Sequence, residues 1–122
     1  MRKQAFEALV REAVGSIPDE FLGIMKNVDI QVRRWPTKDQ VRDADLDEDE
    51  TLLGLYVGIP VTERDSGYNM VQPDIITLFQ GPIEESCTTD AEVQAQVRDT
   101  VVHEVAHYFG ISDSELFDWG LA

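Results

Sequence analysis

Both histidines of this 122-residue chain stand in one short stretch, HEVAH, four residues apart. On an α-helix, side chains at this spacing lie one turn apart on the same face, separated by roughly 6 Å along the axis. Two imidazoles can then converge on one metal ion at about 2.0–2.1 Å, the usual Zn–N distance. HExxH also occurs by chance, but a glycine and an aspartate follow it here at regular steps. His103 and His107 are therefore predicted to be metal ligands.

Glu104 follows the first histidine and points about 100° around the helix, so it can reach a metal-bound water rather than the metal itself. A carboxylate at that place can accept a proton as the water attacks a carbonyl, and then return it to the leaving amine. Glu104 is therefore predicted to be the general base of a hydrolytic site. Zinc is the expected cofactor, although iron, manganese or cobalt could also enter such a site.

The chain has no third histidine, so a third protein ligand must be a carboxylate, Cys87 or something unusual. Gly110 stands three residues after the second histidine, where a left-handed conformation would reverse the chain beneath the helix end. That reversal could bring Asp113 under the ion. Two histidines and one carboxylate would leave a fourth position open for water, as in a catalytic zinc site. Glu115 and Asp118 are weaker candidates, because both fall on what is predicted to be the next helix.

Hydrophobic periodicity predicts the elements that must position these residues. Helices are predicted at 3–14, 16–27, 89–109 and 112–122, and strands at 28–35, 51–60 and 73–82. The long third helix is expected to begin with a capping box formed by Thr89 and Glu92, and to end at Gly110. Helices followed by a small mixed sheet and one long helix predict an α+β fold. The length predicts a single domain spanning residues 1–122.

Charge and composition narrow the class of partner. Ten basic residues against 24 acidic ones give a formal net charge of −14, which disfavours nucleic acid and anionic membrane surfaces. No window approaches a membrane-spanning apolar run, and the charged N-terminus does not resemble a signal peptide. A single cysteine excludes an intrachain disulfide. Together these features predict a cytoplasmic protein.

The stretch HEVAHYFGISD, with LLGLYVGIPVTER and PDIITLFQGPIE, resembles the small bacterial zincin-like metallopeptidases over most of the chain. Their extended signature HExxHxxGxxD is matched at His103, Glu104, His107, Gly110 and Asp113. The resemblance implies a minimal zincin-like fold, in which a small mixed sheet packs against a long active-site helix, with N-terminal and C-terminal helices. It also implies that His103, His107 and Asp113 bind one zinc ion and that Glu104 is the general base. The pattern is similar to that of the metzincins, but no methionine follows the helix.

A peptidase also needs a donor that stabilises the oxyanion and a surface that binds the peptide. Tyr68 and Arg64 are the candidate donors, whereas Tyr108 is expected to be a helix-surface aromatic residue. Zincin-like enzymes bind substrate as an extra strand at a sheet edge, which segment 74–79 could offer, although an ordinary core strand is an equal alternative. Cys87 could occupy the open zinc position as a thiolate, but a lone cysteine is more often packed and inert.

The sequence thus predicts a zinc-dependent peptidase that acts on peptides or unfolded protein segments. Two alternatives stay open: a catalytically inactive zincin-like scaffold that serves as a binding or regulatory module, and a metal that only ties helices together.

Overall fold

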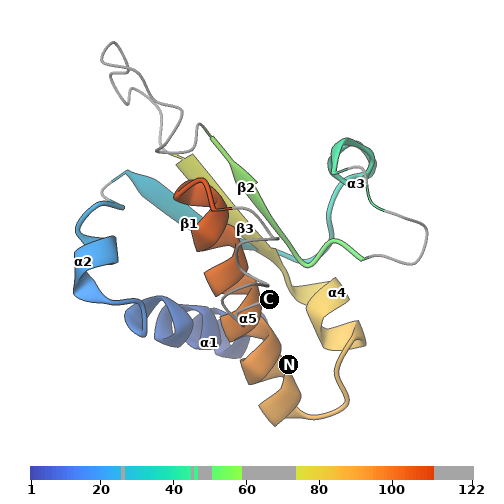
Figure 1. Cartoon of the computed structure of the whole chain (residues 1–122). Coiled ribbons are helices and arrows are strands. Elements are labelled where there is room, and N and C mark those ends of the chain that lie inside the picture. The colour runs from blue at the N-terminus through green and yellow to red at the C-terminus, as the bar shows by residue number, and fades with distance from the viewer. Residues whose placement is uncertain (26, 45, 47–50, 59–73, 112–122) are drawn as a thin grey trace.

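Five helices and three strands make up the described part of the chain (Figure 1), and the computed structural model describes residues 1–25, 27–44, 46, 51–58 and 74–111 of it. In chain order the elements are α1 (Lys3–Gly15), α2 (Asp19–Leu22), β1 (Val28–Arg33), α3 (Lys38–Asp43), β2 (Gly54–Val57), β3 (Asp74–Phe79), α4 (Gln80–Glu85) and α5 (Asp90–Tyr108). The predicted α+β class is confirmed, because a small mixed sheet packs against one long helix. The predicted helix at 112–122 lies outside the described residues.

The last of the described strands, β3, is the central strand of the sheet, whose order is β1-β3-β2. β1 runs parallel to β3, with Val28 opposite Asp74, and β2 runs antiparallel to it, with Gly54 opposite Leu78. Both edges of β3 are therefore paired. The prediction that segment 74–79 offers a free edge to a substrate is wrong, and its alternative, a core strand, is correct. Among the described strands, the edges belong to β1 and β2.

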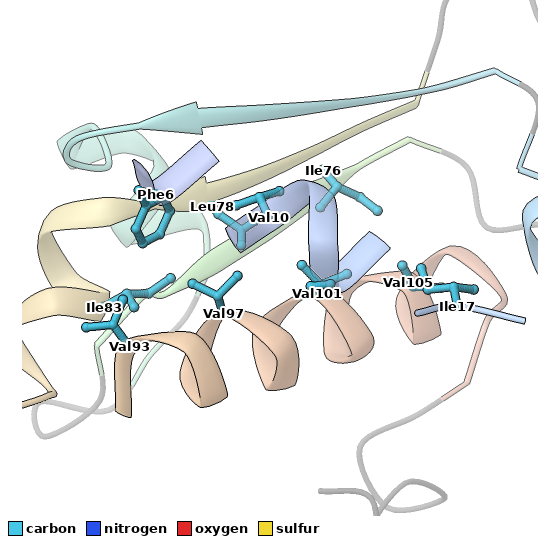
Figure 2. Packing of buried hydrophobic residues seen from close by; sticks show 11 residues of the cluster. Phe6, Val10, Ile17, Ile76, Leu78, Ile83, Val93, Val97, Val101 and Val105 are labelled. Atoms are coloured by element: carbon cyan, nitrogen blue, oxygen red, sulfur yellow. The ribbon is translucent and has the colours of Figure 1, made fainter. Parts of the chain in front are cut away.

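The core lies between the sheet and the two longer helices, α1 and α5. Figure 2 shows four valines in a row along α5, all turned toward the side chains of β3, α4 and α1. Their spacing of four residues keeps them on one face of the helix. The row consists of Val93, Val97, Val101 and Val105, and each is at most 8% exposed. Burying one such side chain contributes about 1.5–3 kcal/mol, so this row fixes α5 firmly against the sheet.

Two short helices were not predicted. In α3, Thr37 and Gln40 form a reciprocal capping box, with bonds of 3.1 Å and 2.9 Å. α4 begins at Gln80, directly after β3, so the third strand ends three residues earlier than the expected stop at Pro82. Proline is tolerated there because an amide in the first turn of a helix has no partner within that helix.

Candidate metal centre

The N-terminus of α5 is capped by two threonines. The Thr89 hydroxyl accepts a hydrogen bond from the backbone N–H of Glu92 at 3.1 Å. The Glu92 carboxylate accepts from the backbone N–H of Thr88 at 2.6 Å and from its hydroxyl at 3.0 Å. Half of the predicted capping box therefore forms as expected, between Thr89 and the N–H of Glu92. The Glu92 carboxylate bonds to the N–H of Thr88 instead of that of Thr89. These bonds, the one from the Thr88 backbone first, lower the pKa of Glu92.

The C-terminus of α5 closes in a Schellman motif. Gly110 has a φ of 74°, its N–H donates to the carbonyl of His107 at 3.0 Å, and Ile111 N–H donates to the carbonyl of Ala106 at 2.9 Å. The predicted reversal at Gly110 is confirmed, and it holds His107 in the last turn of the helix. Asp113, which that reversal was predicted to carry beneath the ion, lies outside the described residues and stays a prediction.

The two histidines face one another across one turn of α5. Their ring centroids are 4.8 Å apart, and the ring planes are inclined by 71°. The ligand atoms of His103, Glu104 and His107 all lie within 4.8 Å of one another. Ligands on a tetrahedral zinc ion are about 3.4 Å apart, as follows from a Zn–N distance of about 2.05 Å. Small side-chain rotations close this difference, so the two histidines can hold a metal ion with the Glu104 carboxylate close beside it.

Glu104 supplies the strongest evidence that a cation belongs here. Its side chain is 7% exposed, and Oε2 has no hydrogen-bond partner within the described part of the chain. Nδ1 of His107 lies 3.4 Å from Oε2, without hydrogen-bond geometry. Leaving a buried carboxylate oxygen unsatisfied costs about 1–3 kcal/mol or more, and a metal ion would offset that cost. The donor set, two imidazoles and a carboxylate, suits zinc and similar divalent metals.

Gly54 allows Glu104 to occupy this buried position. A Cβ at residue 54 would come 2.7 Å from Cγ2 of Thr100 and 3.2 Å from Cγ of Glu104. Only a glycine lets β2 approach this close to α5. Sequence reasoning missed this role, although a glycine inside an apolar strand is a known signal of close backbone approach.

Tyr108 is buried, so its prediction as a helix-surface residue is wrong. It is 1% exposed, and its hydroxyl donates to the carbonyl of Ile24 at 3.3 Å. Its ring meets that of Tyr56 edge to face at 6.0 Å, and the Tyr56 hydroxyl donates to Asp74 at 3.0 Å. The chain of contacts from Tyr108 through Tyr56 to Asp74 ties the metal end of α5 to both β2 and β3.

The other predicted site residues are not brought into this cluster. Cys87 precedes α5, and the length of helix from Asp90 to His103 is about 20 Å at 1.5 Å per residue. That distance excludes the Cys87 thiolate as a ligand of the same ion. The remaining candidates fall outside the described residues: Arg64, Tyr68, Asp113, Glu115 and Asp118.

Comparison with known proteins gives the family and the fold. A family model described as zincin-like metallopeptidase matches residues 25–120, a range that includes the whole cluster. A solved structure of a conserved hypothetical protein from Thermus thermophilus superposes with a TM-score of 0.61 at 23% sequence identity, covering 89% of this chain and 94% of that one. At this identity the likeness shows the fold alone. No curated protein matches the chain. Within the described residues, no helix is long and apolar enough to cross a membrane.

Proposed function

Because the chain belongs to the zincin-like metallopeptidase family, we propose that it hydrolyses peptide bonds at a zinc ion held by His103, His107 and Asp113. One observation carries the proposal. The Glu104 carboxylate is buried beside both imidazoles with one oxygen unsatisfied, which is the position that a general base in a metal-dependent hydrolase needs.

Zinc, when bound, polarises the scissile carbonyl and lowers the pKa of a coordinated water to about 7. The protein supplies the rest of the chemistry. His103 and His107 present neutral nitrogens as ligands. Glu104 accepts a proton from the water as its oxygen bonds to the carbonyl carbon. When the C–N bond breaks, Glu104 delivers that proton to the departing nitrogen, so the products are a carboxylic acid and an amine.

The substrate that fits this arrangement is an extended peptide or an unfolded segment lying along β2. This strand replaces the central strand β3 as the proposed binding edge, because it is an edge strand and its Gly54 adjoins Glu104. Adding a strand there would bring a substrate backbone close to the metal cluster. Tyr68 and Arg64 remain the proposed donors to the oxyanion.

Two measurements on the same preparations test the proposal: zinc per chain by elemental analysis, and cleavage of a peptide library after reconstitution with zinc. The parent is expected to bind about one zinc and to cleave peptides. Glu104→Gln keeps the shape of the side chain but cannot act as a base, so it should retain zinc and lose about 10²–10⁴ in rate. Asp113→Ala should lose most of its zinc.

Asp99→Asn is the matched control, because Asp99 is an exposed carboxylate on the same helix. It should leave zinc and cleavage unchanged. Full turnover in Glu104→Gln contradicts the assigned base. Stoichiometric zinc without cleavage of any library peptide contradicts the peptidase proposal and favours the binding-module alternative.

A further inference from the structure

The outer edge of β1 carries backbone groups without partners in the described structure. In the parallel pairing with β3, Val28 is opposite Asp74, and the amide of Asp74 donates to the carbonyl of Asn27 at 2.9 Å. The alternation of a parallel ladder then directs Asp29, Gln31 and Arg33 toward β3 for hydrogen bonding. The N–H and C=O groups of Val28, Ile30 and Val32 therefore point away from the sheet, where a further strand could pair with them.

A groove runs beside this edge, between β1 and α1. Its volume is about 600 Å³. Its lining includes four apolar side chains, two from each element: Val10 and Val14, and Ile30 and Val32. The other four lining residues are charged or polar: Glu7, Arg11, Gln31 and Arg33. Ile30 and Val32 are only half-buried by the described residues. Strand addition would therefore bury apolar surface as well as satisfy backbone groups.

The charges on the other face of β1 run in a fixed order along the strand. Gln31 donates to the Asp29 carboxylate at 2.8 Å, and Arg33 lies 3.5 Å from the Gln31 side-chain oxygen. A negative end and a positive end are thus separated by one glutamine. In an antiparallel pair centred on Gln31, Asp29 lies opposite Arg33 of a second copy, and Ile30 lies opposite Val32 of that copy. Both charges meet opposite charges, and both apolar residues meet apolar residues.

The same order recurs on α1. Glu7 and Arg11 both line the groove, one helical turn apart. A two-fold axis through the strand pair relates the two grooves, so each copy offers the other one acidic and one basic helix residue. The strand edge and its groove together contain two acidic residues, Asp29 and Glu7, and two basic residues, Arg11 and Arg33. The whole chain, by contrast, has 24 acidic and ten basic residues. The edge and its groove are therefore a region where two strongly acidic molecules can approach with little repulsion.

We propose that this edge is a self-association surface, on which β1 pairs antiparallel with β1 of a second copy about a two-fold axis at Gln31. The contact joins two three-stranded sheets into one of six strands. β1 and β2 lie on opposite sides of β3 (Figure 1), so dimerisation leaves the β2 edge and the metal cluster accessible.

A charge swap tests the pairing. Asp29→Arg places like charges opposite one another twice in each dimer, and sedimentation velocity should show the dissociation constant rising by about ten-fold. Adding Arg33→Asp in the same chain restores opposite charges, so the double variant should return close to the parent value. Both side chains are exposed, so neither change is expected to disturb folding. Asp99→Arg, which alters the net charge equally on a distant exposed site, should dimerise like the parent.

Cysteine cross-linking tests the register, in a Cys87→Ser background that removes the native thiol. In the proposed register the two copies of residue 31 form a non-hydrogen-bonded pair, with Cα atoms about 4.5 Å apart. Gln31→Cys should therefore give an interchain disulfide on mild oxidation. Asp29→Cys is the matched control, because the two thiols would be about 14 Å apart along the strands and should not cross-link.

A parent that stays monomeric at every concentration overturns the proposal, as does a dimer that is insensitive to Asp29→Arg. A dimer that cross-links equally through residues 29 and 31 overturns the register. Capture of an extended peptide by a monomeric parent at this edge would assign the edge to a different occupant and would also overturn it.

Discussion

Gly54 of β2 lies against Glu104 of α5 so closely that no side chain fits between the strand and the helix. A Cβ at residue 54 would be 3.2 Å from Cγ of Glu104, 2.7 Å from Cγ2 of Thr100 and 3.3 Å from the carbonyl oxygen of Thr77. Real Cβ atoms essentially never approach another heavy atom within 3.0 Å. The glycine therefore sets the spacing between the edge strand and the proposed base.

Gly54→Ala is expected to destabilise the protein by about 1–3 kcal/mol, because the added methyl group overpacks the contact between β2 and α5. It should also lower peptide cleavage, since the carboxylate of Glu104 is displaced. Urea denaturation measures the first effect, and steady-state kinetics on a cleaved peptide measures the second.

Two further variants separate this steric effect from a general effect of replacing glycine. Thr100→Ser removes the Cγ2 atom but keeps the hydroxyl that donates to the carbonyl of Gln96 at 2.8 Å, so it should restore part of the stability lost in Gly54→Ala. Gly15→Ala adds a methyl group with nothing within 4 Å and should be neutral or slightly stabilising. Equal losses from Gly54→Ala and Gly15→Ala would contradict the steric explanation.

Much of α5 could be predicted from the sequence because its signals are local. Valines recur at helical spacing, Thr89 caps the start, and Gly110 marks the end. The four-residue spacing of the histidines predicted their convergence, which the structure confirms. Each of these inferences depends on residues within one or two turns of one another.

The arrangement of the sheet could not be predicted in the same way, because strand order depends on contacts between distant segments. β3 is the last of the described strands in sequence but the central one in space, so the strand that was expected to offer a free edge is paired on both sides. The burial of Glu104 beneath Gly54 is also long-range, since fifty residues separate them. The start of α4 at Gln80 was hidden by Pro82, which suggests a break but is compatible with a first turn.

Removing the charge of Glu104 should stabilise the metal-free protein. In Glu104→Gln a small rotation of the side chain lets the new amide donate to Nδ1 of His107, which lies 3.4 Å from the present Oε2. The variant no longer buries an unsatisfied carboxylate oxygen, so its free energy of unfolding is expected to rise by about 1–3 kcal/mol. Urea denaturation with a chelator at pH 8 measures the change. Asp99→Asn, at an exposed site, should stay within about 0.5 kcal/mol of the parent.

Zinc should reverse this order of stability. A ligand that binds only the folded state adds about 2.7 kcal/mol at one hundred times its dissociation constant. The parent is expected to gain more than Glu104→Gln does, by at least the roughly 1–3 kcal/mol that separates the metal-free proteins, because the cation also compensates the buried negative charge. Equal stability of the two metal-free proteins would mean that the Glu104 oxygen is satisfied in solution, and would remove the main evidence for a cation there.

The end of α5 gives a third prediction. Gly110→Ala should cost about 1 kcal/mol, because its φ of 74° is unfavourable for a residue with a Cβ. The carbonyl of His107 accepts from this residue, so fraying of the turn should also weaken zinc binding. Gly110→Asn should cost less in both measurements, since asparagine tolerates the left-handed region better than alanine. Urea denaturation measures the stability, and competition with a zinc indicator measures the zinc affinity. A loss of stability without any change in zinc affinity would contradict the prediction that this turn supports the metal site.

The start of α5 gives a prediction about pH. Hydrogen bonds from Thr88, the backbone one first, lower the pKa of Glu92 below its usual value of 4.5. A carboxylate whose pKa is lower in the folded state stabilises the fold above the unfolded value and loses that contribution as pH falls through the folded value. The stability of the parent relative to Glu92→Gln should therefore be constant above about pH 5.5 and should decline below about pH 4.5. Thr88→Val keeps the backbone donor at 2.6 Å but removes the hydroxyl donor at 3.0 Å, so its pH dependence should be intermediate. Urea denaturation of the three proteins between pH 3 and pH 7 tests this order, and parallel curves for the parent and Glu92→Gln would contradict it.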